Sequence, residues 1–334
     1  MSKKIGVIGA GSFGTALAMV LVSKGHQVKI WGRKKVQLDL MKETRENPHY
    51  LPGVRLPKEL EMAYTLEEAL TDVDMALFSV PAQSFRGVFK EAANYITPDT
   101  IVVNVAKGIE KGTLMRLSQV AKEIMPDVRY AALSGPSHAE EVARKLPTTV
   151  AVAADEEALA LEVQETFITE RFRVYSNGDI AGVELGGSLK NIIALGAGIS
   201  DGMGFGDNAK AALMTRGITE MVRLGTCMGA EMETFSGLTG IGDLIVTCTS
   251  MHSRNRRCGI MIGKGTAPEE AIDEIGMVVE GISTAEAAYA LAQKHGIEMP
   301  ITESIYKVIH GEMNARDAVE FLMVREMKNE MKIH

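Results

Sequence analysis

The sequence has few cysteines and lacks any long uninterrupted hydrophobic run. Its three cysteines, Cys227, Cys248 and Cys258, are odd in number and lack the spacing of a metal site, as is typical of thiols in a reducing cytoplasm. No stretch of about 18 apolar residues occurs, and the apolar stretch behind Lys4 is too short and too rich in glycine for a secretory signal. We therefore expect a cytoplasmic protein with no membrane span and no metal.

An excess of basic charge is also absent. The 36 Lys and Arg residues are outnumbered by 43 Asp and Glu residues, which gives a net charge of -7. Because a nucleic-acid-binding domain usually has a basic face, we expect no nucleic-acid partner. A local basic cluster can still bind a small phosphorylated ligand. The 334 residues, 46% of them hydrophobic, suffice for one large domain or two ordinary ones.

The hydrophobic pattern changes near residue 178. Before it, short apolar strands separated by helical stretches indicate a parallel sheet covered on both faces, with strands expected at residues 5–8, 28–31, 74–80, 100–106, 130–134, 147–154 and 172–176. After it, hydrophobic positions recur at three and four residues, which predicts helices at residues 180–199, 209–228, 267–274, 284–295, 301–309 and 315–323. We expect an α/β fold, with a doubly wound, mostly parallel Rossmann-like domain at 1–178 and an all-helical substrate-binding domain at 179–334. The cleft between two such domains is the default ligand site.

Three glycines, Gly9, Gly11 and Gly14, have the spacing G-x-G-x-x-G between the first expected strand and a helical stretch. In a dinucleotide-binding turn the first permits the tight turn, the second lets the backbone approach a pyrophosphate, and the third lets the helix pack on the strand. The helix N-terminus then offers free N–H groups to the anion. An ordinary glycine-rich turn is the alternative.

The acidic residue that commonly follows the second strand of an NAD site is missing. Arg33 and Lys34 stand there instead. A guanidinium at this place suits a ribose 2′-phosphate, and Arg33 can also stack on the adenine. We expect NADPH to be preferred and leave acceptance of NADH open. A solvated basic triplet with Lys35 is the alternative.

Two further strand ends carry polar residues. Lys107 follows the strand at 100–106, and Gly135 and Ser137 follow the strand at 130–134. Because ligands of an open parallel sheet lie beyond the carboxyl ends of its strands, we expect these residues near the nicotinamide or the substrate. His138 is an acid–base candidate, with a surface or capping role as the alternative.

Lys190 lies in an apolar helical stretch behind Gly186 and Gly187. Two glycines inside a helix cost about 2 kcal/mol relative to alanine. They share the face of Lys190, so we expect them to leave room for a ligand beside its ammonium group. A partly buried lysine can polarise a carbonyl and exchange a proton with it. The alternative is a lysine that extends to solvent, with glycines that serve helix packing.

A glycine-rich segment at 237–242 precedes Asp243, which is a plausible partner for Lys190. Ser253, Arg254 and Asn255 then form a helix start. Free N–H groups, a hydroxyl and a guanidinium at such a place are suited to a phosphate monoester. As a lone basic run, this segment would be a solvated face.

On these motifs the chain resembles the bacterial NAD(P)-dependent glycerol-3-phosphate dehydrogenases. The resemblance covers nearly the whole length and is carried by GAGSFGTALA, NPHYLPG, VNVAKGIE, LSGPSHAEEVA, ELGGSLKNIIALGAGISDG, GLTGIGDLIVTCTS, SRNRRCG and VVEG. It implies a Rossmann domain, a helical substrate domain, and interconversion of dihydroxyacetone phosphate and sn-glycerol 3-phosphate that supplies glycerophospholipid synthesis.

The resemblance also implies residue roles. Lys190 is implied to be the proton donor and acceptor. The implied substrate contacts are Lys107, Gly135, Ser137, Lys190, Asp243, Ser253, Arg254 and Asn255. The implied cofactor contacts, beside the three glycines, are Ser12, Phe13, Arg33, Lys34, Tyr50, Lys107, Ala139, Arg254, Val278 and Glu280. The family often has Trp where this chain has Phe13, which should alter packing against the cofactor and not the chemistry.

Three other readings stay open at this point. A related β-hydroxyacid dehydrogenase would need a site that binds a carboxylate. The SRNRR cluster is better suited to a phosphate. A non-catalytic NADP-binding sensor need not keep Lys190 beside two glycines. A nucleotide-sugar dehydrogenase would use a catalytic cysteine, and Cys248 has no activating base beside it in the sequence. We expect a homodimer, the commonest soluble assembly.

Overall fold

The structure is a computed structural model that describes residues 2–325, and it divides into two compact units. The sheet unit comprises the chain up to Ala106 together with Leu117–Val183. The helical unit comprises Lys107–Arg116 and the chain from Glu184 onward. The short segment Lys107–Arg116 therefore groups with the helices although its neighbours in sequence belong to the sheet unit. The domain boundary near residue 178 stays a prediction.

The sheet unit is built on eight strands in the order β10-β9-β8-β7-β6-β1-β2-β5. Their bounds are β1 Lys4–Ile8, β2 Gln27–Trp31, β5 Glu61–Ala63, β6 Met75–Phe78, β7 Ile101–Asn104, β8 Arg129–Ser134, β9 Thr148–Ala154 and β10 Phe172–Asn177. All neighbouring pairs are parallel except β8 and β9. The predicted α/β class with a mostly parallel sheet is confirmed.

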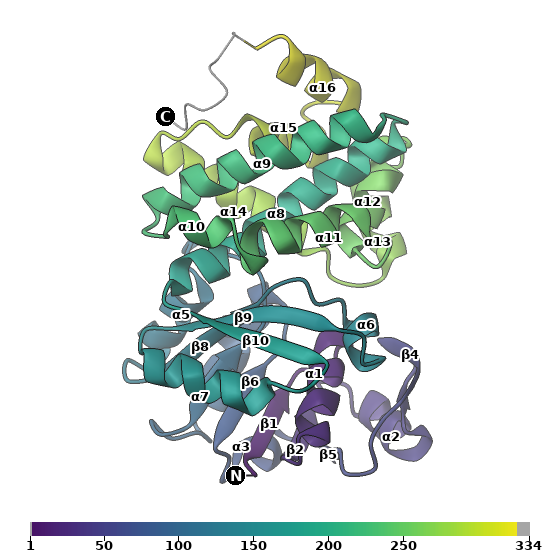
Figure 1. Ribbon diagram of the computed structural model, residues 1–334. Helices are drawn as coiled ribbons and strands as arrows, with labels where there is room; N and C mark the ends of the chain where they lie inside the picture. Colours follow the sequence, from purple (N-terminus) through teal and green to yellow (C-terminus); the bar gives the residue numbers. More distant parts are fainter. Residues whose placement is uncertain (1, 326–334) are drawn as a thin grey trace. The chain divides into compact units, whose positions relative to one another are not determined.

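Helices cover this sheet, as a parallel sheet with apolar strands requires (Figure 1). They are α1 Ser12–Ser23, α2 Lys35–Thr44, α3 Leu66–Leu70, α4 Phe85–Ala92, α5 Leu117–Ile124, α6 Ala139–Ala143 and α7 Glu157–Phe167, with a single 3₁₀ turn, η1, at Ala82–Ser84. A two-stranded sheet of β3 Glu46–Asn47 and β4 Leu51–Arg55 follows α2. Neither this pair nor β5 was predicted, because β3 and β5 have only two and three residues, and β4 contains Pro52 and Gly53, which are unfavourable in a strand.

The register of the sheet brings several loops to one edge. Ile8 pairs with Trp31 on one side and with Phe78 on the other, and Phe78 pairs with Asn104. The carboxyl ends of four adjacent strands therefore line up. Ligands of open α/β sheets bind beyond this edge.

The helical unit contains α8 Ile180–Gly202, which begins in the sheet unit, and α9 Asp207–Cys227, α10 Met232–Phe235, a π-helical turn η2 Leu238–Gly242, α11 Asp243–Thr249, α12 Arg254–Gly263, α13 Pro268–Ile275, α14 Glu280–His295, α15 Pro300–Ile309 and α16 Ala315–Met323. The residues of α8 are buried from Val183 to Ile199. This burial on all sides matches its apolar sequence, since a helix that is hydrophobic all round belongs in a core.

Helices α8 and α12 pack unusually closely. A Cβ atom on Gly198 would lie 2.1 Å from the Arg256 carbonyl oxygen, and one on Gly259 would lie 2.1 Å from the Leu195 carbonyl oxygen. Glycine is therefore required on both helices for their backbones to touch. This contact fixes the start of α12 with respect to the middle of α8.

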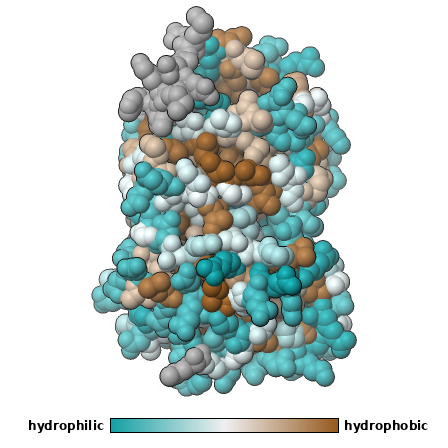
Figure 2. All heavy atoms as spheres, viewed as in Figure 1, coloured by the Kyte–Doolittle hydropathy of each residue, from teal (hydrophilic) through white to brown (hydrophobic). Residues whose placement is uncertain are grey.

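No helix within residues 2–325 has the length and apolar character needed to cross a membrane. On the face drawn in Figure 2, hydrophilic side chains cover most of the sheet unit, whereas hydrophobic ones gather in patches on the helical unit.

Candidate active site

The glycine-rich turn has the geometry that its sequence predicts. Gly9 has φ of +119°, and a Cβ there would lie 2.5 Å from the Ser79 carbonyl oxygen. A Cβ on Gly14 would lie 2.1 Å from the Gly9 carbonyl oxygen. A Cβ on Gly11 would meet no atom within 4 Å. Gly9 and Gly14 thus serve the fold of the turn, and Gly11 leaves its backbone approachable from outside.

Helix α1 begins directly behind this turn and suits an anion. Gly11 is its N-cap in an extended conformation, no side chain caps the helix start, and its first turn holds no acidic residue. Ser12 donates a hydrogen bond from its hydroxyl to the Tyr50 carbonyl oxygen at 2.5 Å. Phe13 is half-buried and packs against the hydrophobic core. The turn and helix start fit the pyrophosphate of a dinucleotide.

Arg33 and Lys34 lie just beyond the carboxyl end of β2, and both are exposed. Lys34 is the N-cap residue of α2. The two cations are therefore accessible on the edge of the sheet that carries the glycine-rich turn. This is the place where a dinucleotide would present its ribose.

The loop behind β8 holds the next predicted residues. Gly135 is buried at φ of +140°, and a Cβ there would lie 3.0 Å from Val150 Cα, so the turn requires glycine. The Ser137 hydroxyl donates to the Gly135 carbonyl oxygen at 2.9 Å. His138 precedes the short helix α6 as its N-cap residue without a side-chain capping bond, and Ala139 is its buried first residue. These contacts shape the loop, and the roles of its residues toward ligands stay predictions.

The helical unit contains a buried cluster of two lysines and one aspartate. The Lys107 Nζ lies 2.6 Å from Asp243 Oδ2, and the Lys190 Nζ lies 3.0 Å from Asp243 Oδ1. The Lys190 Nζ also donates to the Thr247 hydroxyl at 2.6 Å. That hydroxyl donates in turn to the Asp243 carbonyl oxygen at 2.6 Å, one helical turn earlier. Asp243 thus carries a separate ammonium group on each carboxylate oxygen.

Burial and charge shift the pKa values in this cluster. Lys190 is 5% exposed, and its burial, helped by the Lys107 charge, lowers its pKa to about 8 against the opposing effect of Asp243. Burial alone would raise the pKa of Asp243, but the two ammonium groups outweigh it and hold that pKa below its usual value. The cluster therefore pairs a stable carboxylate with a lysine that can lose its proton near neutral pH.

The prediction that the glycines before Lys190 open a pocket beside it is wrong for Gly186. A Cβ on Gly186 would lie 2.7 Å from the Thr239 carbonyl oxygen. The glycine serves close packing of α8 against the turn η2, which leads into Asp243. Lys190 itself is buried, so the alternative of a side chain that extends to solvent is also wrong.

The start of α12 is tied to the helices around it. Ser253 is its N-cap, and its hydroxyl accepts the Arg256 backbone N–H at 3.2 Å. The Asn255 amide donates to Asn191 Oδ1 at 2.9 Å and accepts the Gly281 backbone N–H at 2.9 Å. Because Asn191 follows Lys190 in α8, this bond places the start of α12 beside the lysine cluster. Arg254 is exposed there.

The VVEG segment leads into α14. Val278 is 45% exposed, and Glu280 is the first residue of the helix. The basic run behind Ser253 is divided, because Arg256 is half-buried and bonds to Asp201 at 2.8 Å, whereas Arg254 is exposed. Only part of that run is thus a solvated face.

Within the helical unit the structure brings Lys107, Lys190 and Asp243 into direct contact and links Asn255 to their neighbourhood. Thr247 and Asn191, which contact Lys190 and Asn255, were not predicted from the sequence. Thr247 had one detectable signal, since it lies four residues after Asp243 and therefore on the same helix face.

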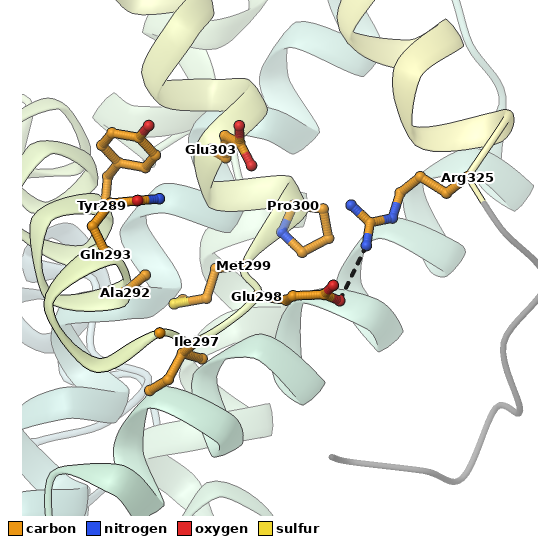
Figure 3. Close-up of a pocket in the computed structure, with 10 residues that line it drawn as sticks. Tyr289, Ala292, Gln293, Ile297, Glu298, Met299, Pro300, Glu303 and Arg325 are labelled. Carbon is orange, nitrogen blue, oxygen red and sulfur yellow. Dashed lines mark hydrogen bonds and ion pairs between the residues drawn. The ribbon is translucent and has the colours of Figure 1, made fainter.

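A cavity of about 280 Å³ lies elsewhere in the helical unit, between the end of α14 and the start of α15 (Figure 3). Glu298 and Arg325 form an ion pair of 3.3 Å at its wall. None of the predicted site residues lines it. The lysine cluster is the stronger candidate for the active site, because its pKa values are shifted by burial and by charged neighbours, as is typical of functional sites.

Two of the three cysteines, Cys248 and Cys258, are buried. Burial raises the pKa of Cys248 to about 12 and that of Cys258 to about 11, so neither is a ready nucleophile. Within residues 2–325 no group of three or more His, Cys, Asp or Glu side chains is placed to hold a metal ion.

Comparison with known proteins gives consistent matches along the chain. Family models described as NAD-dependent glycerol-3-phosphate dehydrogenase, N-terminus and C-terminus, match residues 4–160 and 179–320. Proteins named glycerol-3-phosphate dehydrogenase (NAD(P)+) from Pelotomaculum thermopropionicum and Clostridium tetani are 53% and 51% identical, over 99% and 98% of this chain and 96% and 94% of their own. The crystal structure of glycerol-3-phosphate dehydrogenase from Coxiella burnetii is 41% identical with a TM-score of 0.94, and the match covers 97% of this chain and 99% of that one.

Proposed function

The chain belongs to the family of NAD-dependent glycerol-3-phosphate dehydrogenases, and on that premise we propose that it reduces dihydroxyacetone phosphate to sn-glycerol 3-phosphate, reversibly, with NADPH as preferred cofactor. The observation that carries the proposal is the buried cluster in which Asp243 holds the ammonium groups of Lys107 and Lys190. Reduction of a ketone needs a proton for the carbonyl oxygen and positive charge beside it, and this cluster offers both.

Lys190 is the proton donor in reduction and the acceptor in oxidation. A pKa of about 8 leaves both its protonated and neutral forms populated near neutral pH, which is the condition for efficient general acid–base catalysis. Lys107 places a second ammonium group beside the same carboxylate, near the substrate oxygen. Asp243 and Thr247 fix the direction of the Lys190 Nζ, because each accepts one of its hydrogen bonds.

The start of α12 binds the substrate phosphate. Arg254 supplies a guanidinium and the helix start supplies backbone N–H groups, which together suit a phosphate monoester. Both ends of the Asn255 side-chain amide already have protein partners, so in this proposal Asn255 contributes mainly through its backbone N–H. The Ser253 hydroxyl holds the helix start in place.

The sheet unit binds the cofactor, which supplies the hydride when bound. The N–H groups of the glycine-rich turn and of the start of α1 face its pyrophosphate, and Arg33 faces its 2′-phosphate. In this proposal Ala139, Val278 and Glu280 also contact the cofactor, and Gly135 and Ser137 contact the substrate.

The test is an assay of nicotinamide oxidation with dihydroxyacetone phosphate, run once with NADPH and once with NADH. Lys190→Met should lower kcat by roughly 100-fold or more, the usual scale of general acid–base help. Lys264→Met, an exposed lysine at the end of α12, is the matched control. A near-normal rate in the Lys190 variant contradicts its role. Tight NADPH binding without any turnover would favour a sensor.

The proposal also covers the metabolic role of the enzyme, its location and its assembly. Its product supplies glycerophospholipid synthesis in the cytoplasm, and the enzyme is a homodimer, the commonest symmetric assembly. Sedimentation equilibrium of the purified protein tests the assembly, and a mass equal to a single chain contradicts it.

A further inference from the structure

Two side-chain amides, Gln37 and Asn47, hold one carbonyl group of the glycine-rich turn. The Gln37 Nε2 donates to the Ala10 carbonyl oxygen at 2.5 Å, and the Asn47 Nδ2 donates to the same oxygen at 3.0 Å. We infer that this amide pair positions the turn for the cofactor: by holding the Ala10 carbonyl, it directs the Gly11 N–H toward the pyrophosphate. The inference rests on the cofactor part of the proposed function.

The direction follows from peptide geometry. The Ala10 carbonyl and the Gly11 N–H belong to one trans, planar peptide group, so they point in opposite directions. Once the oxygen is bound on the side of α2 and β3, the N–H must point the other way. On Gly11 a Cβ would meet no atom, so an anion can approach its backbone.

The alternative orientation of this peptide would be harmful to anion binding. Gly11 has no side chain to restrict rotation about its own φ, which is one of the two angles that set the orientation of this peptide. A flipped peptide would present the negative end of a carbonyl dipole to the phosphates. Two donors on the Ala10 oxygen stabilise the favourable orientation before the ligand arrives, and such preorganisation improves affinity.

Asn47 is well placed to act in this way because it is itself immobilised. It is fully buried, its Nδ2 also donates to the Thr15 hydroxyl at 2.9 Å, and its Oδ1 accepts from Gln37 Nε2 at 3.3 Å. Only an amide can donate to Ala10 and Thr15 while it accepts from Gln37. An aspartate of the same shape would turn a carboxylate oxygen toward the Ala10 oxygen.

A second tie supports the same turn from the same segment. The Tyr50 carbonyl oxygen accepts the Ser12 hydroxyl at 2.5 Å, and the Tyr50 backbone N–H donates to the Asn47 carbonyl oxygen at 3.2 Å. Residues 47–50 therefore hold both the turn and the first residue of α1.

The test measures NADPH binding directly, by fluorescence titration without substrate, in Asn47→Leu, Asn47→Asp and Gln37→Met. We expect the NADPH Kd to rise about tenfold in Asn47→Leu, further in Asn47→Asp, and about threefold in Gln37→Met, the scale of one or two hydrogen bonds. In steady state, KM for NADPH should rise more than kcat falls, and KM for dihydroxyacetone phosphate should stay unchanged.

Thr166→Val is the matched control, because Thr166 is a buried polar residue of the sheet unit whose hydroxyl bonds only to Glu162 of its own helix α7. It should lower stability without altering the NADPH Kd. The inference is overturned if Asn47→Leu and Gln37→Met both leave the Kd within about twofold, or if Thr166→Val raises it as much at equal loss of stability. Because the titration contains no substrate, failure of the proposed reaction would leave this result intact.

Discussion

Replacement of Asp243 by Asn removes the negative charge between two ammonium groups while it keeps the shape of the side chain. Lys190 and Lys107 would then face each other's charge with no carboxylate between them. Removal of one partner of a buried ion pair costs about 3 to 5 kcal/mol. Lys190 keeps its bond to Thr247, so we take the lower figure, which corresponds to a fall of about 2 units in its pKa.

The fall has a different effect on the two directions of the reaction. At pH 7, a pKa of about 8 leaves roughly nine-tenths of Lys190 protonated, and a fall of about 2 units leaves roughly one-tenth. Reduction, which needs the protonated form, should therefore lose about tenfold from protonation alone, in addition to any loss of substrate contact. Oxidation needs the neutral form, whose share rises from roughly one-tenth to roughly nine-tenths, so the change in protonation should favour this direction by about tenfold and offset any loss of substrate contact.

The assay is the pH dependence of kcat/KM for dihydroxyacetone phosphate in reduction at saturating NADPH, since this ratio reports the pKa values of the enzyme before the substrate binds. Its alkaline midpoint should lie near 8 in the unaltered enzyme and about 2 units lower in Asp243→Asn. Thr247→Val is the matched control, because it removes a neutral partner of the same Nζ and should move the midpoint much less. An Asp243→Asn enzyme with an unmoved midpoint, or with an equal loss at every pH in both directions, would refute this account of Lys190.

Three further predictions concern Gly186, Glu220 and Arg33. Gly186→Ala would place a Cβ 2.7 Å from the Thr239 carbonyl oxygen, so the free energy of unfolding measured in urea should fall by about 1 to 3 kcal/mol, and kcat should fall too. In the control Gly178→Ala a Cβ meets nothing within 4 Å, so neither quantity should change. Burial raises the pKa of Glu220 from 4.5 to about 7, so the native state binds the proton more tightly than the unfolded chain does. The free energy of unfolding should therefore fall by roughly 3 kcal/mol as the pH rises from 4.5 to 7. A Glu220→Gln variant whose free energy of unfolding shows the same slope with pH contradicts this. Arg33→Ala should raise the NADPH Kd about tenfold or more and leave the NADH Kd nearly unchanged in parallel titrations; equal changes for both nucleotides would rule out a 2′-phosphate contact.

The local sequence determined the elements and the cofactor turn. Apolar runs and helical periodicity located most strands and long helices to within a few residues, because burial on one or both faces constrains each segment independently. The three-glycine spacing predicted the turn, because the left-handed φ of Gly9 and the close approach of Gly14 to the Gly9 carbonyl oxygen both arise within the turn itself. Lys190 and Asp243 were predicted as partners, and the structure confirms their contact.

Only the tertiary structure decided which distant groups meet. Lys107 contacts a carboxylate 136 positions later, and no local pattern specifies that pairing or the membership of Lys107–Arg116 in the helical unit. Gly186 is likewise required by its contact with Thr239, more than fifty residues later. The Asn47 amide bonds to the Ala10 carbonyl oxygen, 37 positions earlier. Local periodicity shows which face of a helix or strand is buried. Which residue that face then contacts depends on how the helices and strands pack against one another.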